Sequence, residues 1–278
     1  SVIQGGDGGM EYPMCTLILG EGDLPGPAET MIHEIAHSWF QMVLASNEAL
    51  YAWMDEGFAS FAEAEAMRNL FEIKDVYAPA YKNYTQLALA GNEEPASQHA
   101  DFFSLNKAYS TAAYVKGSIL LNQLRYITGE ANFWKGMRRY YEAWKFRHPE
   151  PNDFIRIMEK TSGLQLKWFF NYWVNTTKQI DYSFQKVIEN NGATYVTLER
   201  AGEMPMPIDL LVTYKDGSKE LFYIPLNETL GSKPAEDPDV MRTELDPWPW
   251  VYPTYILKIN RSAGSIAILE IDPSGRLA

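Results

Sequence analysis

The sequence is poor in cysteine, in histidine and in basic residues. Cys15 is the single cysteine among 278 residues, so no disulfide can form within the chain and the redox compartment stays open. Lysine and arginine total 24 against 36 acidic residues, which leaves a formal net charge of −12. That balance argues against nucleic acid or an anionic membrane as a partner.

Long apolar runs are also missing. No run approaches the roughly 18–20 residues of a membrane-spanning helix, so we expect no transmembrane segment. Residues 1–4 carry no signal peptide, and the chain does not begin with methionine. We expect a soluble piece of a longer protein, whose parent could be cytoplasmic or exported to the periplasm or cell envelope. The oligomeric state stays open.

The residues that are present predict an ordered protein with two kinds of structure. Hydrophobic residues make up 46% of the chain, enough for a sizeable core. Apolar spacing predicts helices over 27–44, 53–71, 75–90, 110–128, 130–146, 152–162 and 166–174. Strands are expected over 10–19, 181–188, 194–200, 208–214, 220–224, 255–260 and 266–271.

The change from helices to strands predicts an α+β fold with two domains. Residues 1–177 would form a mostly α-helical domain behind a short strand region, and residues 178–278 a small all-β, immunoglobulin-like sandwich. Asn191-Gly192 and Asp216-Gly217 are typical hairpin turns and support the second domain.

The motif His33-Glu34-x-x-His37 lies inside the first expected helix. Its two histidines are four residues apart, so both imidazoles share one face and could bind one Zn²⁺. Glu34 lies at the edge of that face, where it could meet a metal-bound water. The chain has only 4 histidines, which makes a chance match improbable. The alternative is a helix with two hydrogen-bonded structural histidines.

Glu56 is the candidate for the third metal ligand. It follows His37 after 18 intervening residues, and an antiparallel second helix would bring it back beside the first. Glu63 lies seven residues further along the same face and could accept the N–H of a ligating imidazole. The alternatives are an exposed first-turn glutamate at 56 and a solvated charge at 63.

These residues resemble the gluzincin aminopeptidases of the aminopeptidase N type, with their HExxH-x18-E zinc motif. The family carries a Gly-x-Met-Glu-Asn strand before the first histidine, and this chain has Gly8-Gly9-Met10-Glu11-Tyr12 there. The resemblance implies that Glu11, with Gly8 and Gly9, binds the substrate and that the Glu11 carboxylate holds its free α-amine. Tyr12 departs from the family's asparagine, which puts the hydrogen bonding beside Glu11 in doubt.

The family also has a Tyr-x-Lys-Gly sequence on a later helix, which Tyr114-Val115-Lys116-Gly117 matches. The resemblance implies that Tyr114 stabilises the oxyanion, whereas spacing alone would make it a core residue. Gln41-Met42 departs from the family's Gly-Asn and puts local packing in doubt. The resemblance covers residues 5–175.

The resemblance implies a thermolysin-like catalytic domain that lacks the family's N-terminal β-domain and binds one zinc ion per chain. The implied activity is that of an aminopeptidase on peptides with a free N-terminus, in which Glu34 acts as general base on a metal-activated water. A zinc endopeptidase of the same clan, an inactive binding scaffold and an epoxide hydrolase remain alternatives.

Overall fold

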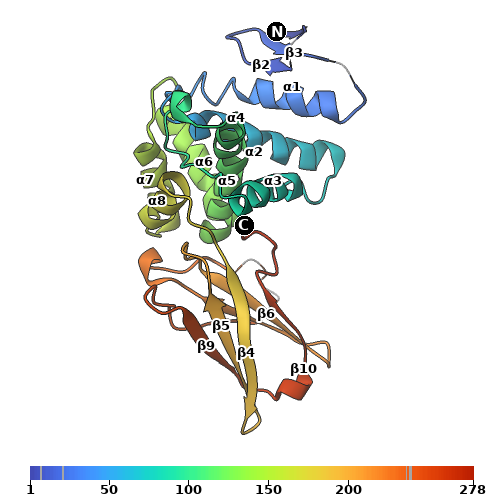
Figure 1. The fold of residues 1–278 in the computed structure, drawn as a ribbon, viewed down its shortest axis with the longest axis vertical. Coiled ribbons are helices and arrows are strands. Elements are labelled where there is room, and N and C mark those ends of the chain that lie inside the picture. Colours follow the sequence, from blue (N-terminus) through green and yellow to red (C-terminus); the bar gives the residue numbers. More distant parts are fainter. Residues whose placement is uncertain (7, 21, 236, 238–239) are drawn as a thin grey trace.

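A computed structural model describes residues 1–6, 8–20, 22–235, 237 and 240–278. Figure 1 shows an elongated molecule with short strands at one end, helices in the middle and a pair of sheets at the other end. The fold is therefore α+β. The division into domains at residue 177 stays a prediction, although the helices end at Asn175 and the next strand begins at Tyr182.

The short strands form a small sheet over the first helix. Strand β3 (Thr16–Ile18) pairs in parallel with β1 (Val2–Gln4) and antiparallel with β2 (Gly9–Met10). The expected continuous strand over 10–19 is wrong. The chain turns back between β2 and β3, where Met14 has a φ of 66° and follows a proline that cannot donate a ladder hydrogen bond.

The helical part surrounds one buried helix. The elements in order are α1 (Gly26–Ala36), α2 (Ala52–Phe71), α3 (Ala78–Leu89), η1 (Ala100–Phe102), α4 (Asn106–Ser110), the π-helical η2 (Thr111–Lys116), α5 (Gly117–Thr128), α6 (Glu130–Trp144), α7 (Pro151–Ser162) and α8 (Lys167–Asn175). Every residue of α5 is buried, so its neighbours cover it on all sides. Of the helices in the described ranges, none has the length and apolar character needed to cross a bilayer.

Two expected helices differ from the structure. The expected helix over 27–44 is α1 alone, because the backbone bends after His37 and that histidine's ring contacts the Phe40 carbonyl at 2.8 Å. The expected helix over 110–128 consists of a π-helical turn followed by α5. No proline or run of glycines marks either change in the sequence. A prediction from hydrophobic periodicity therefore makes the first helix too long and joins the two parts of the second.

The strand region is a sandwich of two sheets. One sheet has the order β10-β6-β7-β8 and the other β4-β5-β9. Their bounds are β4 (Tyr182–Asn190), β5 (Ala193–Arg200), β6 (Ile208–Tyr214), β7 (Lys219–Ile224), β8 (Arg242–Glu244), β9 (Thr254–Ile259) and β10 (Ile266–Ile271). The hairpins at Asn191-Gly192 and Asp216-Gly217 are confirmed. Inward side chains of both sheets, such as Val196 and Leu210, share one core.

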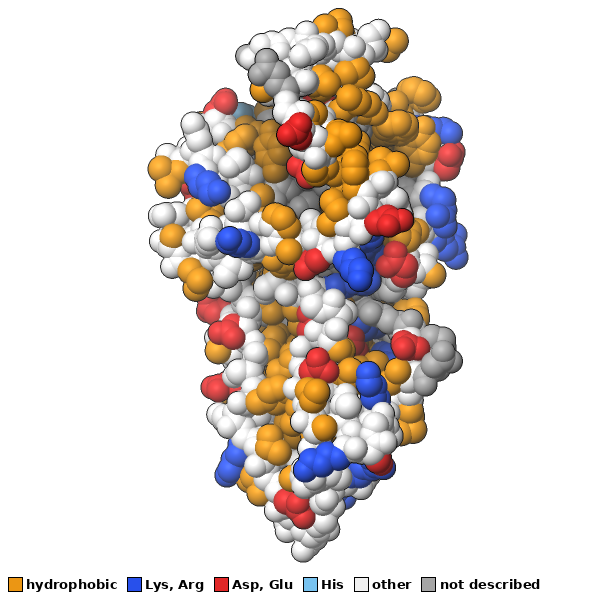
Figure 2. All heavy atoms as spheres, turned by 90° about the vertical axis from the view of Figure 1, so that its right-hand side faces the viewer, with side chains coloured by type: hydrophobic (Ala, Val, Ile, Leu, Met, Phe, Trp, Pro, Cys, Tyr) orange, Lys and Arg blue, Asp and Glu red, His pale blue; other side chains and the backbone are white. Residues whose placement is uncertain are grey.

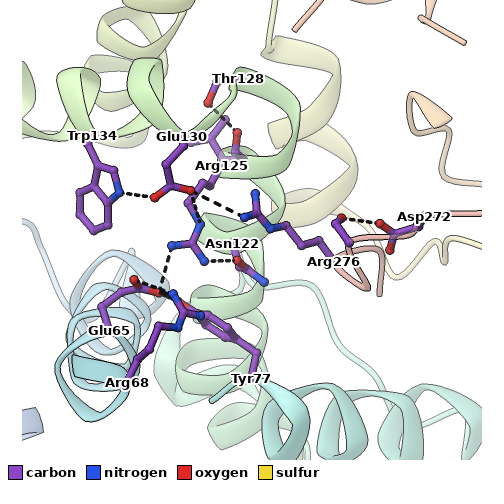
Figure 3. A network of polar contacts seen from close by, with 12 residues as sticks. Glu65, Arg68, Tyr77, Asn122, Arg125, Thr128, Glu130, Trp134, Asp272 and Arg276 are labelled. Carbon is purple, nitrogen blue, oxygen red and sulfur yellow. Dashed lines mark hydrogen bonds and ion pairs between the residues drawn. The ribbon is translucent and has the colours of Figure 1, made fainter. Parts of the chain in front are cut away.

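The C-terminal tail joins the sandwich to the helices through a polar network (Figure 3). Arg125 of α5 is 2% exposed, and its guanidinium lies 3.1 Å from the Glu65 carboxylate of α2. Glu130 at the start of α6 lies 3.7 Å from both Arg125 and Arg276 of the tail. These contacts hold the tail against α6 and join α5 to α2.

Candidate active site

The first two candidate ligands come from the end of α1. His33 lies in the last turn, and His37 caps the helix with its backbone N–H directed to the His33 carbonyl. Both side chains are buried, and their Nε2 atoms are 3.2 Å apart. The four-residue spacing therefore places both imidazoles on one face, as predicted.

Glu56 completes a triangle of donor atoms. It lies in the first turns of α2, which packs against α1. Its Oε2 is 3.1 Å from His33 Nε2 and 3.3 Å from His37 Nε2. A tetrahedral ion with bonds of about 2.0–2.1 Å separates neighbouring donors by about 3.3–3.4 Å. Two imidazole nitrogens and one carboxylate oxygen at this spacing fit a zinc ion.

The outer ring nitrogens are held in the orientation that such a site needs. His33 Nδ1 is 3.1 Å from Glu63 Oε2, so Glu63 lies where the sequence placed it. His37 Nδ1 faces Asp55 Oδ1 at 2.7 Å and the Phe40 carbonyl at 2.8 Å. Donating Nδ1–H to these oxygens leaves both Nε2 lone pairs directed at the centre of the triangle.

The electrostatics of the triangle favour a positive charge. Burial opposes protonation of His33, but its hydrogen bonds to Glu56 and Glu63 prevail and raise its pKa to about 9. Burial also opposes protonation of His37, but its hydrogen bonds to Asp55 and Glu56 prevail and raise its pKa to about 11. Burial raises the pKa of Glu56, but hydrogen bonds from both histidines and Tyr114 lower it to about 2. A divalent cation supplies the charge that this environment stabilises.

Asp55 is the site residue that sequence reasoning missed. Its carboxyl is 2% exposed, and burial raises its pKa to about 7 despite the hydrogen bond with His37. In the sequence it reads as a first-turn acid that favours the helix dipole. Its position directly before the candidate ligand Glu56 was the available signal.

The Glu34 carboxylate is buried beside the triangle. The residue is 8% exposed, and its Oε2 has no hydrogen-bond partner among the described residues. Burial raises its pKa, as suits a base poised for proton transfer. Gly9 passes so close that a Cβ there would collide with Glu34 Oε1, which explains why a glycine occupies this position.

The structure also brings Glu11 to the site. Donor atoms of Glu11, His37 and Asp55 lie within 4.8 Å of one another. This second group therefore shares His37 with the triangle. A Cβ on Gly8, the other predicted substrate residue, would meet open space, and its part in substrate binding stays a prediction.

Tyr114 reaches the triangle from the π-helical segment η2. Its hydroxyl donates a 2.6 Å hydrogen bond to Glu56 Oε1, and its ring stacks on that of His33 with centroids 5.7 Å apart. Burial raises its pKa, so the phenol stays a proton donor. A π-turn in an α-helix frequently marks a functional position, and here it carries the predicted tyrosine.

A cavity of about 480 Å³ opens on one side of the donors. His33, Glu34 and Tyr114 are among its lining residues, and Glu29 and Glu63 add two further carboxylates. The arrangement can bind a metal ion, hold a base beside it and admit a substrate.

Comparison with known proteins assigns the family. The model described as "Peptidase family M1 domain" matches residues 24–173. The chain is 26% identical over 205 residues to tricorn protease-interacting factor F2 of Thermoplasma acidophilum, covering 70% of this chain and 26% of that relative. It is 28% identical over 156 residues to aminopeptidase N of Streptomyces lividans, covering 54% of this chain and 18% of that relative. The chain thus spans about a quarter or less of these relatives.

The solved structure of Legionella pneumophila aminopeptidase A in complex with aspartic acid has a similar fold. The TM-score is 0.60 at 14% identity, over 94% of this chain and 29% of that one. The similarity therefore extends over the helices and the sandwich together. Because the family model covers more than half of the sequence, this chain belongs to peptidase family M1.

Proposed function

We propose that this chain carries the active site of a zinc aminopeptidase, with His33, His37 and Glu56 as the metal ligands. The observation that carries the proposal is the triangle of donor atoms with sides of 3.1–3.3 Å. The names of relatives, such as aminopeptidase N and human glutamyl aminopeptidase, support the reaction class.

One zinc ion held there would supply Lewis acidity and lower the pKa of a water molecule at the site. Glu34, whose Oε2 has no hydrogen-bond partner among the described residues, takes a proton from the attacking water and passes it to the leaving amine. The Tyr114 hydroxyl exchanges its bond to Glu56 for one to the oxyanion that develops on the scissile carbonyl. Glu63 and Asp55 keep the two imidazoles in their ligating orientation.

Glu11 decides which peptide bond is cut. Its carboxylate near His37 pairs with the α-ammonium of the substrate, the natural counter-charge for an acidic group in a closing pocket. The amine of the first residue is two bonds from its carbonyl carbon, so anchoring the amine leaves the first peptide bond at the donors. The substrate class is peptides with a free N-terminus, cut one residue at a time.

The test uses the full-length protein and a panel of aminoacyl p-nitroanilides, each also in N-acetylated form. We expect zinc-dependent hydrolysis of the free-amine substrates, its loss in Glu34→Ala, and full activity in the control Glu203→Ala, which removes an exposed glutamate of the sandwich. Cleavage of N-acetylated substrates would instead make this a zinc endopeptidase. Bound zinc without Glu34-dependent turnover would make it a binding scaffold.

A further inference from the structure

We propose that the cavity beside His33 receives the side chain of the substrate's second residue and that Glu29 makes this subsite prefer lysine and arginine. This inference rests on the proposed function. The inference concerns the substrate residue on the C-terminal side of the scissile bond. Neither the donor triangle nor the Glu11 carboxylate sets a preference for the side chain of that residue.

The direction of the substrate follows from which site residues lie near Glu11 and which line the cavity. Donor atoms of Glu11, His37 and Asp55 lie within 4.8 Å of one another. The cavity lining includes His33 but neither Glu11 nor His37. A peptide whose amine is held at Glu11 places its first carbonyl at the donors, so the chain beyond the cut bond continues toward the cavity.

The cavity has the chemistry of a subsite for a long basic side chain. Its volume is about 480 Å³, within the usual range for a ligand pocket. Val76, Ala80 and Val115 provide apolar surface, Glu29 and Glu63 provide carboxylates, and the lining contains no lysine or arginine. The aliphatic stem of lysine or arginine packs on the apolar part, while its charged end reaches the carboxylates.

Glu29 is placed to select the charge. It lies on α1 four residues before His33, so its side chain is one turn from the donors on the same helix face. No lysine or arginine pairs with it within the described part of the chain. Burial, followed by the nearby charge of Glu63, raises the pKa of Glu29.

A second observation points to a polar ligand at the inner end of the cavity. Glu34 is 8% exposed, lines the cavity, and has an Oε2 without a partner in the described residues. The first turn of α1 and the end of α2 lie on the right in Figure 1, the side that Figure 2 faces. Figure 2 shows hydrophobic side chains interspersed with acidic and basic ones over the helical half of this face.

The test compares two tripeptides that differ only in the charge of the second residue, Ala-Arg-Ala and Ala-citrulline-Ala. Alanine release by the full-length, zinc-loaded protein gives kcat/KM for each. We expect arginine to be favoured about tenfold, since a charge-assisted hydrogen bond is worth at least that factor. The ratio of the two kcat/KM values should fall toward one in Glu29→Gln and at high salt. It should persist in the control Asp23→Asn, which removes an exposed carboxylate outside the cavity lining.

Three results would overturn this inference. They are a wild-type ratio near one, a ratio that Glu29→Gln leaves unchanged, and a Glu29-dependent charge preference at the first residue, measured with Arg-Ala-Ala and citrulline-Ala-Ala. Alanine p-nitroanilide, which has no second residue, separates the two proposals. If this substrate is hydrolysed in a Glu34-dependent way, a kcat/KM ratio of one for the two tripeptides contradicts only the proposed subsite. If it is not hydrolysed, both the aminopeptidase and the subsite proposals fail.

Discussion

A contact between two glycines sets the distance between Glu56 and Tyr114. Gly57 of α2 and Gly117 at the start of α5 pack so closely that a Cβ on Gly117 would lie 2.7 Å from the Gly57 Cα and 3.2 Å from the Trp53 carbonyl. Gly57 directly follows Glu56 on α2, and Gly117 comes three residues after Tyr114, which lies in η2. Replacing Gly117 with alanine should therefore displace the site as well as the packing.

The size of the displacement can be worked from the contact. Ordinary van der Waals contact begins at 3.4 Å, so the helices must separate by about 0.7 Å, the difference from 2.7 Å. That change takes the 2.6 Å hydrogen bond between Tyr114 and Glu56 beyond the usual range for an O–H···O bond. Overpacking costs about 1–3 kcal/mol of stability, and a misplacement near 1 Å costs up to about a hundredfold in rate.

The assay pairs urea unfolding with kcat on an aminoacyl p-nitroanilide. Gly136→Ala is the matched control, because its Cβ would collide with Met158 between α6 and α7, among none of the site residues. We expect both variants to lose stability but only Gly117→Ala to lose about tenfold to a hundredfold in kcat. Equal stability loss with wild-type kcat in Gly117→Ala would refute the idea that the glycine contact positions the site.

Three further predictions concern single side chains. Glu11→Gln should abolish hydrolysis of free-amine substrates while zinc stays bound, and wild-type kcat/KM in this variant would remove Glu11 from the anchor role. Asp55→Asn should weaken zinc binding about 10–100-fold in a chelator competition, because it removes the carboxylate facing His37; unchanged affinity would leave the Phe40 carbonyl as the sufficient partner. Lys116→Met should cost about 3–5 kcal/mol in urea unfolding, because it leaves the Glu93 carboxylate, 2.5 Å away, buried without its cation. Adding Glu93→Leu should recover much of that loss, and a double variant as unstable as the single one would contradict the pair's role.

The donor triangle was predictable because its spacing is local. A four-residue step on α1 and a helix–loop–helix return account for His33, His37 and Glu56 without knowledge of the rest of the fold. Glu11 and Tyr114 needed the family resemblance, since a short strand and a helix position carry no chemical signal by themselves. The alternation of strands and hairpin turns sufficed for the sandwich, where β6 and β10 match their expected bounds.

What could not be predicted depends on contacts between distant elements. The contact between the Asp55 carboxylate and the His37 ring requires the bend after α1. No helix-breaking residue in the sequence marks that bend. The cavity combines Glu29 of α1, Glu63 of α2 and Val115 of η2, three segments whose approach only the packed structure shows. The turn between β2 and β3 replaced an expected strand because backbone geometry at Met14, not hydrophobic alternation, decided it.

The most direct test of the central claim is the zinc content of the purified full-length protein, measured by elemental analysis beside His33→Ala. The donor triangle predicts one zinc ion per chain in the wild type and its loss in the variant. A wild-type protein that binds no stoichiometric zinc, or a variant that keeps the full amount, would contradict the assignment of His33, His37 and Glu56 as the metal site.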